Sequence, residues 1–522
     1  MERLRQSTFS QYCLDAFRLR GNEIAFTYGD RHLTGFECLA LAHALAAVLA
    51  SHGVGRGEGV CVLSSNRPES FITEVASQMI GGRYTGLHPS ASLADHQFVL
   101  QNSAARALVY DPVAFGERAV QIAAHTPGVQ LFSLGPGPVG KNILALAAVA
   151  QPVTDPVALE DDIAFIFYTG GTSGKPKGVV HTQRSWYHQS LQIQAHWQWP
   201  HDPVLLVTAP ITHAAGGLVA PALALGGRVV LVDGFEPSDF LRIVQQERVS
   251  VTFLVPTMIY KLLDHPETRL FDLSTIRTLV YGASTISLER LLEARALFGD
   301  VLLQGYGQTE IGSGSLLLLK QDHLSGQPDI LASAGRTPPG VTAQIVDDDD
   351  RPVPPGQPGE LCLRSASVMQ GYWKLPELTV AALRGGWLHT EDIAVMDARG
   401  YITIVGRKKD MVVSGGFNVY PKEIEDALQD HPGVRSSAVV GVPHHIWGEA
   451  VVALVCLVEK DAADQDELKA WIRERKGPVC TPKEIRFADY IPETALGKVD
   501  KNAIRKEWAN ATALHKELRG CS

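Results

Sequence analysis

Tyr168-Thr-Gly-Gly-Thr-Ser-Gly-Lys-Pro-Lys-Gly178 follows a strand-like run, Ile163 to Phe167, and indicates both a fold and a chemistry. A loop of this kind suits phosphate, because backbone N–H groups, hydroxyls and cations can all face one anion. The candidate ligands are the hydroxyls of Thr169, Thr172 and Ser173, the backbone at Gly170, Gly171 and Gly174, and the ammonium groups of Lys175 and Lys177. The stretch therefore predicts a phosphate-binding loop after a strand.

A P-loop is the obvious alternative for such a stretch. That motif needs four residues between its glycines and then Gly-Lys-Ser/Thr, whose hydroxyl binds magnesium. Here only three residues separate Gly170 from Gly174, and Pro176 follows Lys175 where the hydroxyl belongs. The spacing argues against a Walker-type nucleotidase. A plain surface loop would explain the glycines but not two lysines around a proline.

Length and charge set limits on the rest of the chain. Its 522 residues exceed what one hydrophobic core usually supports, so at least two domains are expected. With 45% hydrophobic and 20% charged residues, the composition is that of a globular protein. The 47 basic and 56 acidic residues give a net charge of −9, which argues against a nucleic-acid partner or an anionic membrane surface. Anionic ligands must therefore bind at local positive sites.

The cysteines and the apolar segments favour a cytoplasmic protein without a membrane span. The seven cysteines are scattered and never spaced Cys-x-x-Cys, as is typical of a reducing compartment. The first residues, Met1 to Gly21, lack the apolar core of a signal peptide. The longest apolar stretch, Cys38 to Ala50, is too short to cross a bilayer and predicts a buried helix.

Short β-rich runs alternate with helix-like stretches up to about Gly335. Such alternation predicts an α/β fold with a largely parallel sheet. The runs are Val60 to Ser64, Ala107 to Tyr110, Val204 to Thr208, Arg228 to Val232, Val251 to Val255 and Thr278 to Tyr281. Beyond Gly335 the pattern changes to hairpins. There Asp347 to Asp350 predicts a solvated turn rather than a metal cluster, because consecutive carboxylates do not converge on one point.

A charged break, Gly406-Arg-Lys-Lys-Asp410, separates two strand-like runs and predicts a domain boundary. We expect an N-terminal domain over residues 1–408 and a C-terminal domain over residues 409–522. The C-terminal part is long enough for a small α+β domain. Its helices are expected at Pro421 to Gln429 and Gln465 to Lys476, and its strands at Ser437 to Val442 and Glu449 to Val458.

Five further motifs accompany the phosphate loop, in order along the chain. They are Pro210-Ile-Thr-His-Ala-Ala-Gly216, Gln304-Gly-Tyr-Gly-Gln-Thr-Glu310, Gly386-Trp-Leu-His-Thr-Glu-Asp392, the segment from Gly406 to Pro421, and Pro492-Glu-Thr-Ala-Leu-Gly-Lys-Val-Asp500. With them the chain resembles the adenylate-forming superfamily of acyl-CoA synthetases, peptide-synthetase adenylation domains and beetle luciferase, from about residue 20 to residue 508. The resemblance implies a large N-terminal domain with parallel sheets and a β-barrel-like part, followed by a small mobile α+β domain.

The chemistry of that family explains why such residues are needed. A carboxylate acylates poorly until it is coupled to AMP, which makes a mixed anhydride that a thiol can attack. The site must hold two anions, the carboxylate and the α-phosphate, and therefore needs cations and N–H donors. Glu310 supplies a carboxylate for Mg²⁺ beside the hydroxyl of Thr309. A helix cap would explain these two residues but not the preceding Gly305-Tyr306-Gly307.

The resemblance implies a nucleotide-binding role for most of the matched residues. Tyr306 stacks on adenine in a pocket formed by Gly305, Gly307, Gln308 and the segment Gly282-Ala283-Ser284. Thr309 holds the α-phosphate, and Glu310 binds magnesium with help from Thr169. Asp392 takes both ribose hydroxyls and Arg407 reaches the ribose, since a short acceptor and a donor fork suit a diol and its phosphate.

The same resemblance assigns residues to the two half-reactions. Lys498 bridges the carboxylate and the α-phosphate during adenylation, and Lys409 is the hinge about which the small domain turns. After the turn Gly415 and Gly416 approach the pantetheine of CoA. A histidine satisfied within the core is the plainer interpretation of His213, but the resemblance places it at the carboxylate end of the acyl pocket and implies a substrate-gating role.

Two departures from the family pattern affect these expectations. Glu391 stands where the family usually has glycine, so any backbone shape that needs glycine there is in doubt. Thr212 precedes His213 where an aromatic residue is common, which leaves the shape of the pocket open.

Small residues near the expected pocket favour an acid larger than propionate, aliphatic or aromatic. Acetyl-CoA synthetases have tryptophan at the position of Gly307, where it fills the pocket. Glycine also occupies the neighbouring positions Gly216, Gly217, Gly312 and Gly314. The sequence does not identify the acid.

The predicted activity is that of an AMP-forming acid–thiol ligase that uses ATP, Mg²⁺ and CoA. A stand-alone enzyme that loads a carrier-protein thiol, supplied in trans, is the nearest alternative. A non-catalytic nucleotide-binding regulator is disfavoured by Glu310 and Lys498, which binding alone does not require. The oligomeric state stays open, with a homodimer among the options.

Overall fold

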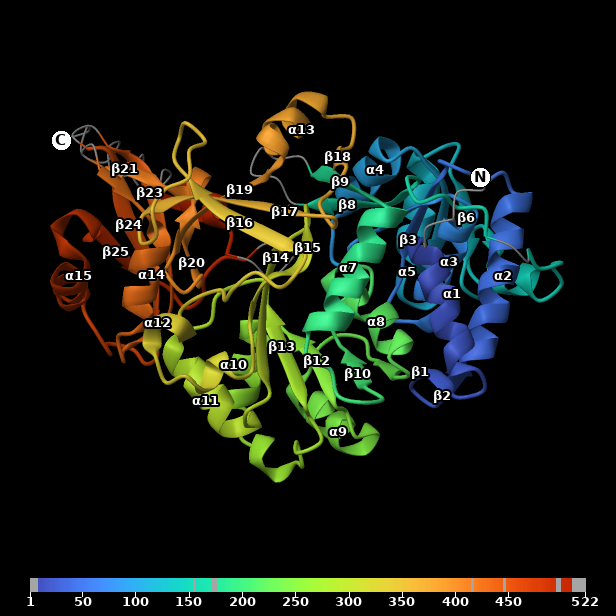
Figure 1. Cartoon of the computed structure of the whole chain (residues 1–522), viewed down its shortest axis with the longest axis horizontal. Coiled ribbons are helices and arrows are strands. Elements are labelled where there is room, and N and C mark those ends of the chain that lie inside the picture. Colours follow the sequence, from blue (N-terminus) through green and yellow to red (C-terminus); the bar gives the residue numbers. More distant parts are fainter. Residues whose placement is uncertain are drawn as a thin grey trace, which may run out of the picture. The chain divides into compact units, whose positions relative to one another are not determined.

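The structure is a computed structural model that describes residues 8–153, 156–169, 176–414, 417–444, 447–493 and 499–508. Figure 1 draws the chain, coloured by residue number. The chain divides into two compact units whose segments alternate along the sequence. The first unit comprises residues 1–283, 293–342 and 363–388, and the second comprises residues 284–292, 343–362 and 389–522. Segments from the middle of the chain thus belong with its C-terminal part. The functional boundary after residue 408 stays a prediction.

One eight-stranded sheet of the first unit has the order β15-β14-β13-β12-β10-β11-β1-β2. Its strands are β1 (Ile24–Tyr28), β2 (Arg31–Thr34), β10 (Val204–Val207), β11 (Arg228–Leu231), β12 (Val251–Leu254), β13 (Thr278–Gly282), β14 (Leu302–Gln308) and β15 (Gly312–Leu318). The six inner strands of this order, β14, β13, β12, β10, β11 and β1, run parallel to their neighbours. The two edge strands, β2 and β15, are antiparallel to theirs. The predicted parallel sheet is confirmed.

The second eight-stranded sheet has the order β18-β9-β8-β4-β3-β5-β6-β7. Its strands are β3 (Gly59–Leu63), β4 (Arg83–Gly86), β5 (Ala105–Tyr110), β6 (Gln130–Ser133), β7 (Lys141–Asn142), β8 (Ile163–Thr169), β9 (Lys177–Thr182) and β18 (Gly371–Tyr372). The strands from β8 through β4 to β7 are parallel, whereas β9 and β18 are added antiparallel at the edge. The phosphate loop thus connects two antiparallel neighbours.

Helices and strands both supply apolar residues to the main core of the first unit. In the N-terminal half they are α1 (Phe9–Arg20), α2 (Gly35–Ser51), α3 (Pro68–Met79), α4 (Leu93–Asn102), α5 (Pro112–His125), α6 (Ile143–Ala147), α7 (Gln183–His196) and α8 (Val219–Ala224). Those that follow are α9 (Pro237–Glu247), α10 (Pro256–Asp264), α11 (Leu288–Phe298), α12 (Pro328–Leu331) and α13 (Pro376–Ala382).

Helix α2 shows how local signals and burial combine. It begins with a capping box in which Thr34 and Glu37 bond to each other's backbone N–H, which satisfies the first orphan donors of the helix. Its apolar side chains, among them Cys38, Leu45 and Leu49, are fully buried in the core. The expected buried helix over Cys38 to Ala50 is confirmed.

The second unit contains two mainly antiparallel sheets. The first has the order β16-β17-β19-β20, formed by β16 (Val341–Val346), β17 (Pro358–Ser365), β19 (Leu388–Met396) and β20 (Ile402–Arg407), in the part of the chain where the sequence predicts hairpins. The other contains β21 (Val412–Ser414), β22 (Phe417–Val419), β23 (Val434–His444), β24 (Gly448–Leu457) and β25 (Glu484–Phe487). Helix α14 (Pro421–Gln429) has the predicted bounds, and α15 (Gln465–Cys480) extends beyond its predicted end. Their buried residues form a separate core with β23 and β24.

The side-chain carboxylate of Asp347 organises the acidic turn after β16. Asp347 Oδ1 accepts N–H hydrogen bonds from Asp349 and Arg351, each at 2.9 Å. Within the described part of the chain no three His, Cys, Asp or Glu side chains are grouped to hold a metal ion. Over the same residues no helix is both long and apolar enough to span a membrane.

Candidate active site

The turn between β14 and β15 carries Thr309 and Glu310. Two distant segments hold its backbone: His181 Nε2 lies 2.7 Å from the carbonyl oxygen of Thr309, and the N–H of Met369 donates to that of Glu310 at 2.8 Å. His181 lies on β9, directly after the phosphate loop. The motif residues Thr309 and Glu310 are thus tied through their backbone to the strand that leaves that loop.

Tyr372 provides a second connection at this turn. Its hydroxyl donates to Glu310 Oε1 at 2.8 Å, and Lys177 Nζ lies 4.7 Å from the centre of its ring, within range of a cation–π interaction. The short strand β18 places it there, because Tyr372 pairs with Val179 of β9. The sequence reasoning missed Tyr372, because its partners Glu310 and Lys177 lie far away in the sequence.

The two residues that flank the phosphate loop lie opposite each other on neighbouring strands. Thr169, the last residue of β8, pairs directly with Lys177, the first residue of β9. This pairing brings a hydroxyl and an ammonium group to the mouth of the loop. The predicted ligands Gly170, Gly171, Thr172, Ser173, Gly174 and Lys175 lie outside the described residues.

Parallel strands β13 and β14 bring together the two glycine segments predicted to bind adenine. Gly282 pairs with Gly305, and a Cβ on Gly282 would lie 2.2 Å from the carbonyl oxygen of Gly305, so this approach requires glycine. Tyr306, Gly307 and Gln308 complete β14. Ala283 takes a left-handed φ of 67°, and Ser284 begins a segment of the second unit.

Buried polar side chains lie next to the paired glycines Gly282 and Gly305. The Tyr281 hydroxyl, one residue before Gly282, donates to Gln304 Oε1 at 3.0 Å and lies 2.9 Å from His323 Nε2. Tyr281 and His323 are buried. These contacts link the residues that precede the paired glycines.

His213 begins a short 3₁₀ segment, Ala214–Leu218, and is partly buried. Its Nδ1 lies 2.8 Å from Thr212 Oγ1, and its ring packs edge-on against His88 with centroids 4.7 Å apart. Burial, with a smaller contribution from His88, lowers the pKa of His213 to about 3. The imidazole is therefore neutral near pH 7 and acts as a polar group rather than a counter-ion.

In the second unit, Asp392 and Arg407 lie opposite each other on β19 and β20. Arg407 Nε is 3.1 Å from Asp392 Oδ1, and the carboxylate is only 4% exposed whereas the Arg407 side chain is 46% exposed. The structure thus pairs the two residues predicted to contact ribose. The buried partner is fixed by its strand, and the exposed arginine has more freedom to move toward a ligand.

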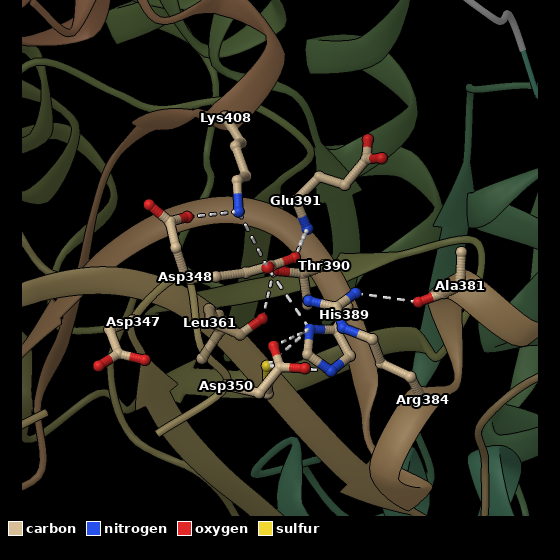
Figure 2. Close-up of polar contacts among 12 residues, drawn as sticks. Asp347, Asp348, Asp350, Leu361, Ala381, Arg384, His389, Thr390, Glu391 and Lys408 are labelled. Carbon is tan, nitrogen blue, oxygen red and sulfur yellow. Dashed lines mark hydrogen bonds and ion pairs between the residues drawn. The ribbon is translucent and has the colours of Figure 1, made fainter. Parts of the chain in front are cut away.

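The backbone before Asp392 is fastened to β17 (Figure 2). Thr390 donates its hydroxyl to the carbonyl of Leu361 at 2.7 Å and accepts the N–H of Asp392 at 3.1 Å. Glu391 has a φ of 59°, a left-handed conformation that glycine adopts without strain. The chain therefore keeps a glycine-like backbone here with a glutamate, whose N–H donates to Glu360 Oε1 at 3.1 Å.

Of the remaining predicted residues, the structure describes Lys409 but not Gly415, Gly416 or Lys498. Lys409 lies in a 3₁₀ segment, Lys408–Asp410, directly after β20. Gly415, Gly416 and Lys498 lie outside the described residues, although Glu493 and Val499, which flank the segment with Lys498, form a β-bridge. Their roles stay predictions.

Comparison with known proteins assigns the family. Residues 15–373 match the AMP-binding enzyme family, and residues 423–498 match the AMP-binding enzyme C-terminal domain. The chain belongs to the AMP-binding enzyme family. It is an enzyme of the AMP-forming acid–CoA ligase family. The predicted fold class, a large mixed α/β part followed by a small α+β part, is confirmed.

Relatives of this AMP-binding enzyme cover nearly its full length. A medium/long-chain-fatty-acid–CoA ligase of Mycobacterium tuberculosis is 38% identical over 530 residues, covering 98% of this chain and 92% of the relative. A feruloyl-CoA synthase of Amycolatopsis is 35% identical over 494 residues, covering 94% and 97%. The solved structure of the amide bond synthetase McbA from Marinactinospora thermotolerans has a TM-score of 0.88 and 32% identity, covering 95% of this chain and 99% of that one.

Glu310 fits the chemistry of a magnesium ligand. Mg²⁺ prefers hard oxygen ligands and is commonly held by one or two carboxylates together with substrate phosphates. Glu310 is partly exposed, and Tyr372 bonds to its Oε1, while Oε2 has no hydrogen-bond partner among the described residues. One oriented carboxylate with an available oxygen is what such a site requires.

His181 makes stability depend on pH. Burial lowers its pKa from 6.5 to about 4, so the folded protein holds the ring neutral where the unfolded chain protonates it. The free energy of unfolding should therefore fall as pH drops from about 6.5 toward 4, by about 2 kcal/mol at pH 5. In His181→Gln the amide can still donate to Thr309 but does not titrate. Urea unfolding at pH 7 and pH 5 should show a smaller loss for the variant, and equal losses would contradict this expectation.

The Tyr372 hydroxyl should matter for binding of magnesium-ATP. Tyr372→Phe keeps the ring over Lys177 but removes the bond to Glu310, and we expect about tenfold weaker binding, since hydrogen bonds to charged groups contribute about 1.5–3 kcal/mol. Calorimetric titration with ATP at several magnesium concentrations measures this. Tyr110→Phe is the matched control, because it removes another tyrosine hydroxyl bond, 2.5 Å to Val139, away from the turn. Equal affinities in the wild type and Tyr372→Phe would refute the role of the hydroxyl.

Proposed function

We propose that this enzyme activates a carboxylic acid larger than propionate, aliphatic or aromatic, and transfers it to CoA. A carboxylate oxygen attacks the α-phosphorus of ATP, the bond to pyrophosphate breaks, and acyl-AMP forms. The CoA sulfur then attacks the acyl carbon, the bond to AMP breaks, and the thiol proton is released. The observation that carries the proposal is the Thr309–Glu310 turn, which His181 and Tyr372 hold beside the strand that begins with Lys177.

The first step needs charge balance around the phosphates. The Thr309 hydroxyl donates to the α-phosphate, while Lys177 and the loop from Thr169 to Gly174 bind the departing pyrophosphate end. Mg²⁺ bound to Glu310, with Thr169 nearby, would neutralise charge on the phosphate oxygens. Lys498 bridges the carboxylate and the α-phosphate.

The proposed contacts to the nucleoside come from an aromatic ring and a carboxylate. Tyr306 stacks on adenine above the glycines of β13 and β14, and Asp392 accepts hydrogen bonds from both ribose hydroxyls. Arg407 leaves Asp392 to reach the nucleotide. The part after Lys409 then turns, which removes Lys498 and brings Gly415 and Gly416 to the pantetheine of CoA.

Neutral His213 suits the carboxylate end of the acyl pocket. A protonated imidazole would pair with the substrate carboxylate and lower its nucleophilicity, whereas a neutral ring can donate a single hydrogen bond. The low pKa of about 3 supports this neutral role over a counter-ion. We propose that His213 orients the acid.

Of the glycines that the sequence assigns to the acyl pocket, Gly217 rather than Gly307 supports a larger acid. A Cβ on Gly307 would lie 2.1 Å from the carbonyl oxygen of Gly312, so the β14–β15 hairpin itself requires glycine there. Similar backbone or side-chain crowding occurs at Gly216, Gly312 and Gly314. At Gly217 the nearest atom to an added Cβ is Trp186 Cζ2, 3.9 Å away. We therefore base the expectation of a larger acid on Gly217.

Relatives support both an acid of this size and CoA as the acceptor. One is named for medium- and long-chain fatty acids and another for ferulate, and both names specify CoA. A carrier-protein thiol is the alternative acceptor. The similar amide bond synthetase adds a third outcome, capture of the acyl group by an amine, which the same assay detects.

Half-reaction assays with Lys498→Ala test the proposal. Pyrophosphate release should depend on the acid across a panel of fatty and aromatic acids, and thioester should form with free CoA. In Lys498→Ala, adenylation should fall at least about a hundredfold, while thioester formation from supplied acyl-AMP survives. Equal loss of both half-reactions would refute the role of Lys498. Acid-dependent pyrophosphate release without CoA thioester would favour the other acceptors.

Gly217 and Gly307 form a matched pair for the acid pocket. Gly217→Leu should fold normally but lower kcat/KM at least about tenfold for long or aromatic acids relative to short ones. Gly307→Ala should instead lower the free energy of unfolding by about 1–3 kcal/mol, because its Cβ meets backbone. Acid panels and urea unfolding of both variants measure these effects. An unchanged acid profile in Gly217→Leu would exclude Gly217 from the pocket.

A further inference from the structure

The carboxylate of Glu360 on β17 is a buried charge that the proposed reaction does not use. Its side chain is 4% exposed, and a carboxylate is costly to bury unless donors surround it. Oε1 accepts the N–H of Glu391 at 3.1 Å. Oε2 lies 3.4 Å from His389 Nδ1 and 3.7 Å from Lys408 Nζ. Two residues of β19 and Lys408, which follows β20, thus converge on one group.

These contacts surround the residues proposed to bind ribose. Glu391 immediately precedes Asp392, and Lys408 immediately follows Arg407, the residue that pairs with Asp392 across the two strands. Lys408 also reaches Asp348 of the acidic turn at 2.9 Å (Figure 2). Glu360 therefore contacts the chain neighbour of each member of the Asp392–Arg407 pair.

The hydrogen bond from the Glu391 N–H to Glu360 stabilises an unfavourable backbone conformation of Glu391. A non-glycine residue at a φ of 59° is strained and persists only where its surroundings hold it. The bond from its N–H to Glu360 supplies that hold. If Glu391 relaxed to an extended conformation, the direction of the following residue, Asp392, would change as well.

A thiol-based chemistry does not account for this cluster. Cys362 Sγ lies 3.3 Å from His389 Nδ1, the same nitrogen that faces Glu360. An imidazole that activates a nucleophile uses one nitrogen for the nucleophile and the other for its carboxylate. Cys362 is also fully buried. The carboxylate, not the thiol, organises the group.

We infer that Glu360 is a positioning residue: its buried carboxylate holds the left-handed backbone of Glu391 and so aims Asp392 at the ribose hydroxyls of ATP. The inference rests on the proposed function, in which Asp392 binds that ribose. It goes beyond that function by assigning nucleotide selectivity to a residue that does not touch the nucleotide. His389 and Lys408 complete the donor set of the carboxylate.

Discrimination between ATP and 2′,3′-dideoxy-ATP tests the inference directly. The ratio of their dissociation constants measures the ribose contacts, whereas a general loss of stability weakens both nucleotides equally. Glu360→Ala should lower this ratio about tenfold or more. Glu360→Gln keeps an oxygen for the Glu391 N–H and should stay within about twofold of the wild type. An unchanged ratio in Glu360→Ala would overturn the inference.

A second substitution makes the test specific to the backbone of Glu391. Glycine adopts a positive φ without help, so Glu391→Gly added to Glu360→Ala should restore most of the lost discrimination. A double variant no better than Glu360→Ala would overturn the proposed route through Glu391. If Glu360→Ala does not fold, Glu360→Asp replaces it. Its shorter side chain should lose the contact and the discrimination, and wild-type discrimination would refute the inference.

Asp392→Ala separates failure of this inference from failure of the proposed function. It should abolish discrimination between the two nucleotides. If it does not, Asp392 does not bind ribose and the proposed function fails at that residue. If Asp392→Ala abolishes discrimination while Glu360→Ala does not change it, only the positioning role of Glu360 is refuted.

Discussion

The adenylation of a carboxylate brings two anions together, and this electrostatic constraint explains how the polar residues of the site are arranged. In the proposed site, the groups assigned to the phosphates, such as Lys177 and Glu310, are charged and partly exposed. Two histidines of the proposed site are kept neutral by burial: His181, which holds the Thr309–Glu310 turn, and His213, which is assigned to the acid. A neutral support adds no repulsion or attraction that would compete with the substrates. Burial therefore sets the charge of the site as well as its shape.

Hydrogen bonds to the backbone carry much of the positioning. The Thr309–Glu310 turn is held through two carbonyl oxygens. The segment before Asp392 is held through the N–H of Glu391 and the carbonyl of Leu361. Contacts of this kind tolerate changes in the side chains of the turn itself. They depend instead on partners that are distant in sequence.

That dependence explains what the sequence could and could not predict. The parallel strands, the buried helix α2 and the bounds of α14 follow from local periodicity and were predicted correctly. Motif order was enough to indicate the family. Tyr372, His181 and Glu360 were missed because their partners lie on other strands, so no local pattern marks them. Gly307 was read as a pocket residue, although the close carbonyl of Gly312 explains the glycine without reference to a substrate.

The interleaving of the two units limits how related enzymes can be recombined. Residues 343–362 belong to the second unit, although they lie well before the charged break at Gly406–Asp410. Gly406 also packs closely on Tyr420, since an added Cβ would lie 3.2 Å from Tyr420 Cδ1. A chimera joined at the break would combine a Tyr420 from one parent with a β20 and an acidic turn from the other. The second unit consists of three separate segments, and all three would have to be exchanged to replace it as a whole. Recombination at a single point would therefore favour parents whose residues already agree at these contacts.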